Sequence, residues 1–176
     1  KLGFASIRNI AFTQGVCAIG SGGHELGVEI VVHLLVVAEL ARALGFLHGR
    51  GLGEDAYCAG LVHDYGKLAL LKSLPLEYLR VASRCRTHRR TALQAEEELL
   101  APMQPNLRNH VQTGAELLRL HGMPESIVLA VGLHHGDPVT HRAEGTVWSV
   151  PALVTIANHL AYRIGYPDGL SETDAA

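Results

Sequence analysis

The sequence predicts a single all-helical domain, folded as a multi-helix bundle. Apolar residues recur at helical spacing along nearly the whole chain, and no stretch alternates strictly enough to indicate a β-strand. The 176 residues are 48% hydrophobic, which supplies enough apolar surface for one compact core. No linker is long enough to divide the chain, so we expect one domain.

Glycine and proline breaks place the predicted helices in order. The first runs from about 2 to 19, and the second from about 24 to 44, closing at Gly45. The third, from about 53 to 73, begins with acidic residues and ends before Pro75. Shorter helices follow at about 76–89 and 91–100. The remaining three lie at about 109–121, at about 124–135, and from the N-cap Ser149 to Gly165.

These helices group into three parts of one domain. Residues 1–22 form a leading helix and loop, and residues 23–166 form the helical core. Residues 167–176 form a C-terminal tail that we expect to fray.

Composition narrows the classes of partner and the location. A formal net charge of −2 lacks the electrostatic footprint of a duplex DNA binder. The most apolar stretch, 27–40, is interrupted by Glu29, His33 and Glu39, and falls short of the roughly 18 apolar residues of a membrane span. Three cysteines without a close-set pair indicate free thiols in a reducing compartment. We therefore expect a cytoplasmic protein that binds neither duplex DNA nor a membrane.

A run of arginines stands out between residues 80 and 90. No acidic residue interrupts it before Glu96. A solvated face is the simplest interpretation, and a docking patch for an acidic partner or a phosphorylated ligand is the alternative.

Histidine is the unusual residue of this composition, with 11 copies against 3 phenylalanines and 1 tryptophan. His33 stands inside the aliphatic run from Ile30 to Val37, with no polar face to turn towards. A buried imidazole without a partner costs on the order of 1 to 3 kcal/mol, so a hydrogen bond or a metal ion must satisfy it. A core histidine bonded to a backbone carbonyl is the simpler alternative.

Three ionisable residues, His63, Asp64 and Lys67, interrupt the next apolar helix. Lys67 follows the other two by four and three residues, spacings that bring side chains to one helix face. A buried Asp–Lys pair is one explanation, although such a pair is seldom a net gain over apolar packing. The other is a metal site in which His63 and Asp64 are ligands and Lys67 meets an anionic ligand.

Two further histidine positions fit the same site. His110 lies in the first turn of its helix, and Gly114 one turn later allows a second helix to approach closely. The pair His134 and His135 closes the next helix, where at least one ring can turn inward. Adjacent residues on a helix point about 100° apart, so one histidine at each of two sites is easier than both at one metal.

The order of these residues resembles the HD superfamily of metal-dependent phosphohydrolases, which includes the HD-GYP cyclic dinucleotide phosphodiesterases. The resemblance covers roughly residues 24 to 165. Details at 59–64, 110–118, Met123-Pro124 and 156–161 are most similar to the HDOD branch, a signalling branch of the superfamily. The first residues resemble the middle of an HDOD domain, which implies that the family's leading helices are missing here.

The resemblance implies an HD-domain-like multi-helix bundle with a metal site in its core, and a set of metal ligands. They are His33, His63, Asp64, His110, His134, His135 and Asn158. In active HD enzymes an aspartate stands at the last of these positions, and an amide oxygen ligates without bringing charge. The Gly-Tyr-Pro motif that follows the paired histidines in cyclic dinucleotide phosphodiesterases is also missing, because Gly165-Tyr166-Pro167 comes too late in the chain. Both departures weigh against an active enzyme.

Imidazole-rich coordination with one carboxylate suits iron, manganese, zinc or nickel, as one or two ions. By the resemblance, Asp64 bridges metals or orients water, and Lys67 stabilises charge on phosphoryl oxygens, which would be their catalytic roles. Two functions stay open. One is a signal-transduction module that binds a phosphorylated ligand, a nucleotide or a signalling protein, and the other is a working phosphohydrolase of nucleotides or cyclic dinucleotides. The sequence does not predict the oligomeric state.

Overall fold

A computed structural model describes residues 3–20, 22, 24–48, 51–103, 107–137 and 148–170. Within these ranges the regular structure consists of helices, and the prediction of an all-helical domain is confirmed. Their bounds are α1 Phe4–Gly20, α2 Glu25–Leu47, α3 Gly53–Val62, α4 Tyr65–Ser73, α5 Pro75–His88, α6 Ala92–Leu99, α7 His110–Leu120, α8 Glu125–Leu133 and α9 Val150–Arg163. Residues 138–147, between the last two predicted helices, and residues 171–176 of the predicted tail lie outside the described residues.

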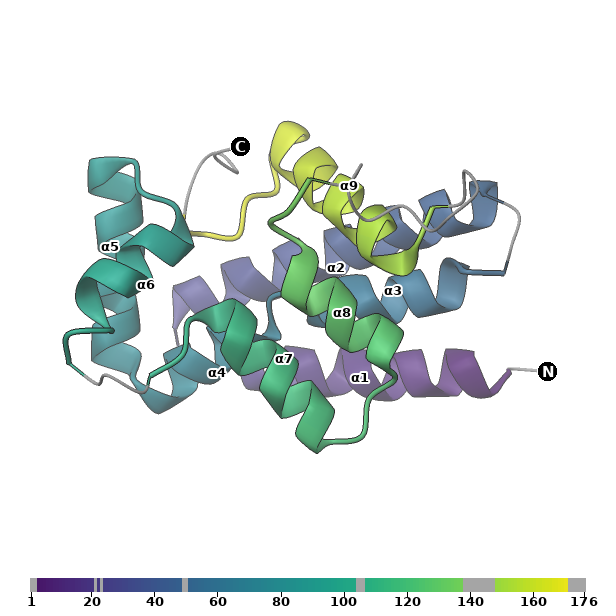
Figure 1. Ribbon diagram of the computed structural model, residues 1–176, viewed down its shortest axis with the longest axis horizontal. Coiled ribbons are helices and arrows are strands. Elements are labelled where there is room, and N and C mark those ends of the chain that lie inside the picture. The colour runs from purple at the N-terminus through teal and green to yellow at the C-terminus, as the bar shows by residue number, and fades with distance from the viewer. Residues whose placement is uncertain are drawn as a thin grey trace.

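Helix α2 is the centre of the bundle (Figure 1). It packs against α3 and α9, while α1 lies along α3 and α2. The α7–α8 pair leans on α4, α3 and α9, and α5 and α6 form a separate hairpin at one end of the molecule. By length and composition alone α2 could cross a membrane, which differs from the expectation for this stretch, and 44% of its most apolar window is buried inside the fold.

Apolar side chains form two clusters that share α2. One joins Ile30 and Leu34 to α4, α5 and α6, and the other joins Val37 and Ala41 to α3, α8 and α9. A helix that is buried on more than one face carries apolar residues nearly all round. This is why α2 is the most continuous apolar stretch of the sequence.

The helix predicted from 53 to 73 is wrong in one respect, because it is two helices. The chain leaves helical geometry at Asp64, with φ −106° and ψ 19°, and α4 starts at the following residue. The amide of Lys67 donates to the Asp64 carbonyl at 2.9 Å and so restarts the helix. The break allows His63 and Asp64 to face one site while α4 turns towards α7.

The crossing of α4 and α7 confirms the close approach that was predicted at Gly114. A Cβ atom on Gly66 of α4 would overlap the carbonyl oxygen of His110, and one on Gly114 would lie 3.1 Å from the amide nitrogen of Gly66. Only glycines allow the two backbones to come this near. The crossing carries His110 to the end of α4 where Asp64 lies.

The C-terminal tail does not fray over its first residues, so that expectation is corrected for residues 167–170. Asp168 is 1% exposed and Leu170 is fully buried. The physical reason is a buried ion pair, in which the Lys67 ammonium contacts the Asp168 carboxylate at 2.5 Å.

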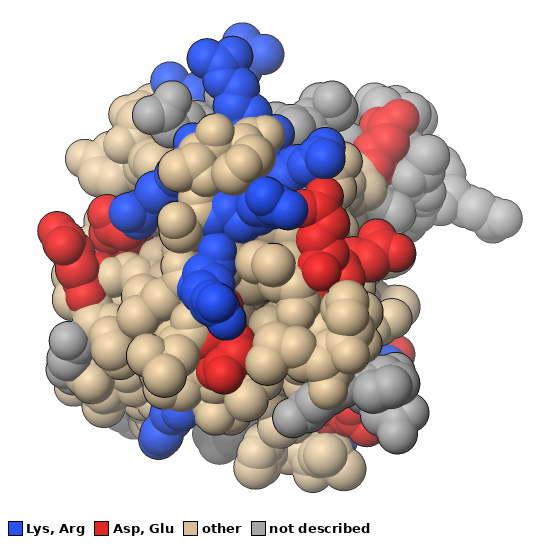
Figure 2. Space-filling model, turned by 90° about the vertical axis from the view of Figure 1, so that its left-hand side faces the viewer, with Lys and Arg blue, Asp and Glu red and all other residues tan. Residues whose placement is uncertain are grey.

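The arginine run lies on the face formed by α5 and its neighbours, where Figure 2 shows Lys and Arg side chains with acidic side chains beside them. Arg84 and Arg90 contact Glu98 at 3.0 and 3.1 Å, and Arg86 contacts Glu29 at 2.7 Å. Exposed pairs of this kind contribute little to stability. The pairing favours the solvated-face interpretation over a docking patch.

Candidate metal centre

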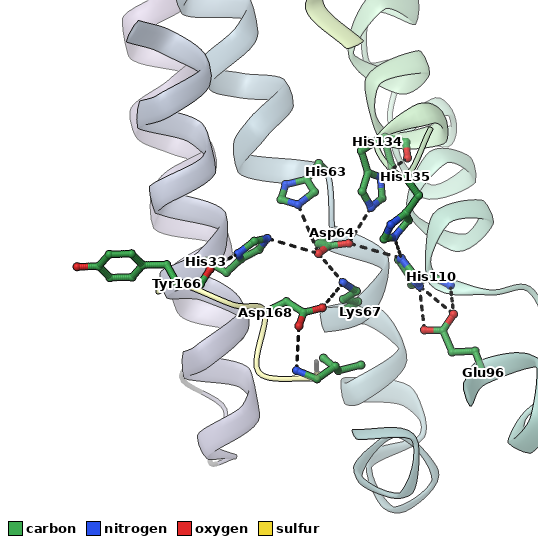
Figure 3. A network of polar contacts seen from close by, with 12 residues as sticks. His33, His63, Asp64, Lys67, Glu96, His110, His134, His135, Tyr166 and Asp168 are labelled. Carbon is green, nitrogen blue, oxygen red and sulfur yellow. Dashed lines mark hydrogen bonds and ion pairs between the residues drawn. The ribbon is translucent and has the colours of Figure 1, made fainter. Parts of the chain in front are cut away.

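Five histidines gather around the carboxylate of Asp64 (Figure 3). They come from the middle of α2, the α3–α4 break, the first residue of α7 and the end of α8, and are His33, His63, His110, His134 and His135. The Nε2 atoms of His134, His63, His110 and His33 lie 3.2, 3.4, 3.6 and 4.0 Å from the Asp64 oxygens. The ligand atoms form two groups that share Asp64, and within each group all lie within 4.8 Å of one another.

Three of these rings are held from behind by backbone carbonyls. The Nδ1 atoms of His33, His63 and His134 each lie 2.7 Å from a carbonyl oxygen, those of Tyr166, Gly60 and Val131 respectively. A carbonyl oxygen can only accept, so each Nδ1 carries the hydrogen and donates it. This is the arrangement that fixes a metal-binding imidazole with its Nε2 lone pair pointing forward.

The forward atoms of these rings have no hydrogen-bond partner. Nε2 of His33, His63 and His134 and Oδ1 of Asp64 are all buried and unsatisfied. Burial, followed by the neighbouring His135, lowers the pKa of His134 to about 4, and burial followed by His63 lowers the pKa of His33. The His33 and His134 rings are therefore neutral and present lone pairs to a carboxylate. A cation would satisfy this arrangement of facing acceptors.

His110 is anchored by a side chain instead of a carbonyl. Its Nδ1 lies 2.8 Å and its backbone amide 2.9 Å from the buried carboxylate of Glu96, which also accepts from the Tyr78 hydroxyl at 2.7 Å. Burial opposes the charge on Glu96, but the contacts with His110 outweigh it and lower the Glu96 pKa. Glu96 thus orients both the ring and the start of α7.

The paired histidines His134 and His135 lie just beyond the end of a helix, so the 100° spacing of a continuous helix does not separate their side chains. Helix α8 ends at Leu133, one residue before the pair, and the His134 and His135 ring centroids lie 4.0 Å apart. His135 Nε2 is 2.9 Å from His110 Nε2. Neighbouring ligands on one metal, each at about 2.1 Å, are separated by about 3 Å. Both histidines therefore face the same group of ligand atoms, which the 100° rule for a continuous helix made less expected.

Lys67 lies between two buried carboxylates. Its ammonium is 2.6 Å from Asp64 and 2.5 Å from Asp168. Burial opposes all three charges, but the Lys67 ammonium holds the Asp64 pKa well below its ordinary value and lowers that of Asp168 to about 2. The carboxylates in turn hold the Lys67 pKa well above its usual range. Asp64, Lys67 and Asp168 are therefore all ionised at neutral pH.

The family model of the HDOD domain matches residues 1–137 of this chain, well over half of it. The chain belongs to the HDOD domain family. Membership confirms the family resemblance seen in the paired histidines and in the His63-Asp64 step.

Solved structures share the HDOD fold. An HDOD domain protein of unknown function from Geobacter sulfurreducens is 22% identical with a TM-score of 0.75, over 94% of this chain and 53% of that one. A protein from Marinobacter aquaeolei VT8, provisionally assigned to signal transduction, is 22% identical with a TM-score of 0.64, over 98% of this chain and 37% of that one. This chain thus spans about half or less of these neighbours. No curated protein sequence matches it.

The structure of this HDOD domain brings together the six histidine and aspartate ligands that the sequence predicts, with Lys67 beside them. Asn158 is 1% exposed on α9, and its role as a ligand stays a prediction. Sequence reasoning missed Glu96 and Asp168. The spacing of Glu96 could have revealed it, because it lies four residues after Ala92 and four before Leu100. These positions share the buried face of their segment. Asp168 had none, since it follows the last helix stop.

Proposed function

We propose that this HDOD domain is a signalling module that holds a divalent transition metal at Asp64 and its histidines, and binds a phosphorylated ligand there. One observation carries the proposal, the four buried and unsatisfied atoms that face one another. Each unsatisfied buried polar atom costs about 1 to 3 kcal/mol. Cations held by the two ligand groups that share Asp64 would satisfy these atoms.

The ligand chemistry supports iron, manganese, zinc or nickel. Imidazole nitrogens outnumber carboxylate oxygens in both ligand groups, whereas magnesium and calcium prefer oxygen. Among the described residues the fully buried charges are the carboxylates of Asp64, Glu96 and Asp168 and the ammonium of Lys67. Leaving the imidazoles aside, these groups sum to a net charge of −2. One dication balances that charge, while two would leave the centre positive and attract an anion.

A phosphorylated ligand fits such a centre. A bound transition metal polarises phosphoryl oxygens and lowers the pKa of water. The chain contributes the fixed imidazoles, the Asp64 carboxylate between the two ligand groups, and a buried ammonium that can pair with phosphate. A nucleotide or another phosphorylated small molecule is therefore the ligand class we propose.

A signalling role is supported by the family and by the Marinobacter aquaeolei neighbour. The partner of such a module would be a signalling protein. The net charge of −2 supports the absence of a duplex DNA partner, and the core packing of α2 supports the absence of a membrane span. Three free cysteines support a cytoplasmic location.

A metal-dependent phosphohydrolase is the second candidate. One observation favours it, because Asp64 is shared by both ligand groups and lies against Lys67, as catalysis at a metal-held phosphate requires. Two features favour the binding module instead. Asn158 replaces the aspartate of active relatives, and Lys67 is sealed by a carboxylate of the chain itself.

Metal analysis tests the proposal. Protein purified without added metal should contain a transition metal, or should bind Mn²⁺, Fe²⁺, Zn²⁺ or Ni²⁺ with a rise in melting temperature. His63→Ala should lose that metal, whereas His121→Ala, at the exposed end of α7, should retain it. A chain that binds none of the four ions contradicts the proposal. Hydrolysis of nucleotides or cyclic dinucleotides that His63→Ala abolishes would select the second candidate.

A further inference from the structure

The residues after α9 form a short segment that closes one side of the metal centre. We call residues 166–170 the C-terminal strap. Its Tyr166 carbonyl accepts from His33 at 2.7 Å, and its Asp168 carboxylate accepts from Lys67 at 2.5 Å (Figure 3). Its Leu170 is fully buried. The strap therefore touches a candidate metal ligand and the candidate anion-binding ammonium at the same time.

A second set of contacts holds the strap from the surface. Arg86 of α5 donates from Nε to the Gly169 carbonyl at 2.8 Å and pairs with Glu29 of α2 at 2.7 Å. The Arg86 and Glu29 side chains are 52% and 40% exposed. Exposed pairs are weak and exchange readily with water. Water and solutes can therefore compete for the Arg86 contacts of the strap, whereas the Asp168 and Leu170 contacts are buried.

Charge neutralisation of Lys67 does not require Asp168. Asp64 already lies 2.6 Å from the ammonium, so a second carboxylate adds surplus negative charge to a buried site. Buried charges without full compensation are costly. Yet the chain supplies this carboxylate from a residue 101 positions away and seals it to 1% exposure.

The consequence is that Lys67 is closed to any external anion. The ammonium is 1% exposed, and the Asp168 carboxylate occupies the side of it away from Asp64. A phosphoryl group has the same charge sign and the same acceptor oxygens as that carboxylate. A phosphorylated ligand that pairs with Lys67 on this side must take the place of Asp168.

We propose that the strap is a gate, in which Asp168 docked on Lys67 and a phosphoryl group bound at the metal centre exclude each other. The inference rests on the proposed function, and it makes strap release the event by which the domain reports ligand binding. Because linkage is reciprocal, weakening the dock must strengthen anion binding, and anion binding must release the strap.

Inorganic phosphate titrated into Mn²⁺-loaded protein tests the first half of this linkage. Asp168→Asn keeps an oxygen to accept from the Leu170 amide, at 2.9 Å, but removes the charge that competes with phosphate. Its phosphate affinity should rise at least about tenfold, as expected when a docked competitor is removed. Arg86→Gln should give a smaller rise, and Arg80→Gln, exposed on the same helix, should give none. Arg86→Gln keeps the test available if Asp168→Asn fails to fold.

Hydrogen exchange at the Leu170 amide tests the second half. Saturating phosphate should speed that exchange in the unsubstituted Mn²⁺-loaded protein, because the amide loses its Asp168 acceptor. Unchanged or weaker phosphate binding in Asp168→Asn, or phosphate binding with the Leu170 amide still protected, overturns the gate and leaves Asp168 as a counterion that frees Asp64. A protein that binds one of the other proposed ions in place of Mn²⁺ is titrated loaded with that ion, and one that binds none of Mn²⁺, Fe²⁺, Zn²⁺ and Ni²⁺ overturns the metal centre itself, and the gate with it.

Discussion

Two regions of the core are built on the same helices but are completed by different means. At one end, Val37 on α2 and Val131 on α8 belong to an aliphatic cluster that packs fully. One turn away, His33 on α2 and His134 at the C-cap of α8 turn unsatisfied nitrogen atoms towards Asp64. The first region is finished by packing alone. The second has its rings fixed in place by hydrogen bonds, with their free nitrogen atoms turned towards one carboxylate.

The difference teaches that stability and site formation are separable in this domain. Aliphatic packing contributes to folding whether or not a metal is present. The polar region costs free energy until a cation arrives, so its contribution is conditional. Substitutions in the two regions should therefore respond differently to added metal, and each of the following experiments uses that contrast.

Gly66→Ala should have the largest effect, because Gly66 joins the two regions. The added methyl group would overlap the His110 carbonyl, a backbone atom that cannot move aside. We expect a loss of at least about 3 kcal/mol of unfolding free energy, the upper end for overpacking, with or without metal. Chemical denaturation measures it. Gly132→Ala on α8, with nothing within 4 Å of the added atom, is the control and should cause no loss.

Asp64→Asn should abolish the gain in unfolding free energy that added metal gives the unsubstituted protein. At a metal concentration 100 times the dissociation constant, the unsubstituted protein should gain about 2.7 kcal/mol. The variant should gain none, because its amide brings no charge to the shared position. Ile127→Val, in the aliphatic region, should lose about 0.5 to 1.5 kcal/mol and keep the full metal increment. Equal metal increments in Asp64→Asn and the unsubstituted protein would refute the separation.

Glu96→Gln should weaken the metal centre without removing a ligand. An amide offers one acceptor oxygen where the carboxylate now accepts from the His110 ring, its backbone amide and the Tyr78 hydroxyl. Loss of such an orienting partner lowers metal affinity about 10- to 100-fold. Metal titration measures the loss, and the nitrogen chemical shifts of His110 report its tautomer. Glu97→Gln, exposed on the same helix, is the matched control.

The contrast between the regions also explains what the sequence could predict. Helical periodicity is a local signal, so most helices were placed within a few residues. His33 and the His63–Asp64 step were found because polar residues inside aliphatic runs are conspicuous. The break at Asp64 was missed because the surrounding residues favour a helix, and it is tertiary packing of α4 on α7 that turns the chain.

The missed partners are non-local. Asp168 contacts Lys67, which lies 101 residues earlier in the chain. Because Asp168 follows the helix stop at Gly165, its neighbours in the sequence look like those of any C-terminal tail. Glu96 meets His110 across 14 residues through a connection between two helices. Candidate metal ligands can be recognised in the sequence from their residue type. The residues that orient them can be recognised only once the fold shows which side chains they contact. That is why the ligand set was predictable and its support was not.

Acid should give the smallest effect, and it isolates the strap. Among the charges around Asp168, the Lys67 ammonium attracts it while Asp64 repels it, and its pKa falls from an ordinary 3.8 to about 2. A depressed carboxyl pKa adds stability above the unfolded value and loses it as the pH falls towards the folded value, here from about 4 to about 2. Between pH 6 and pH 3 this one group should account for about 1 kcal/mol.

Urea denaturation in the presence of a chelator measures that difference. The unsubstituted protein should lose about 1 kcal/mol more than Asp168→Asn over the interval from pH 6 to pH 3. Asp55→Asn provides the matched control, since Asp55 is 48% exposed in its pair with Arg8 and should change the pH dependence less. An identical acid response in Asp168→Asn and the unsubstituted protein would mean that the strap is not held by charge. Leu170 packing would then be its fastening, and the polar region would end at Lys67.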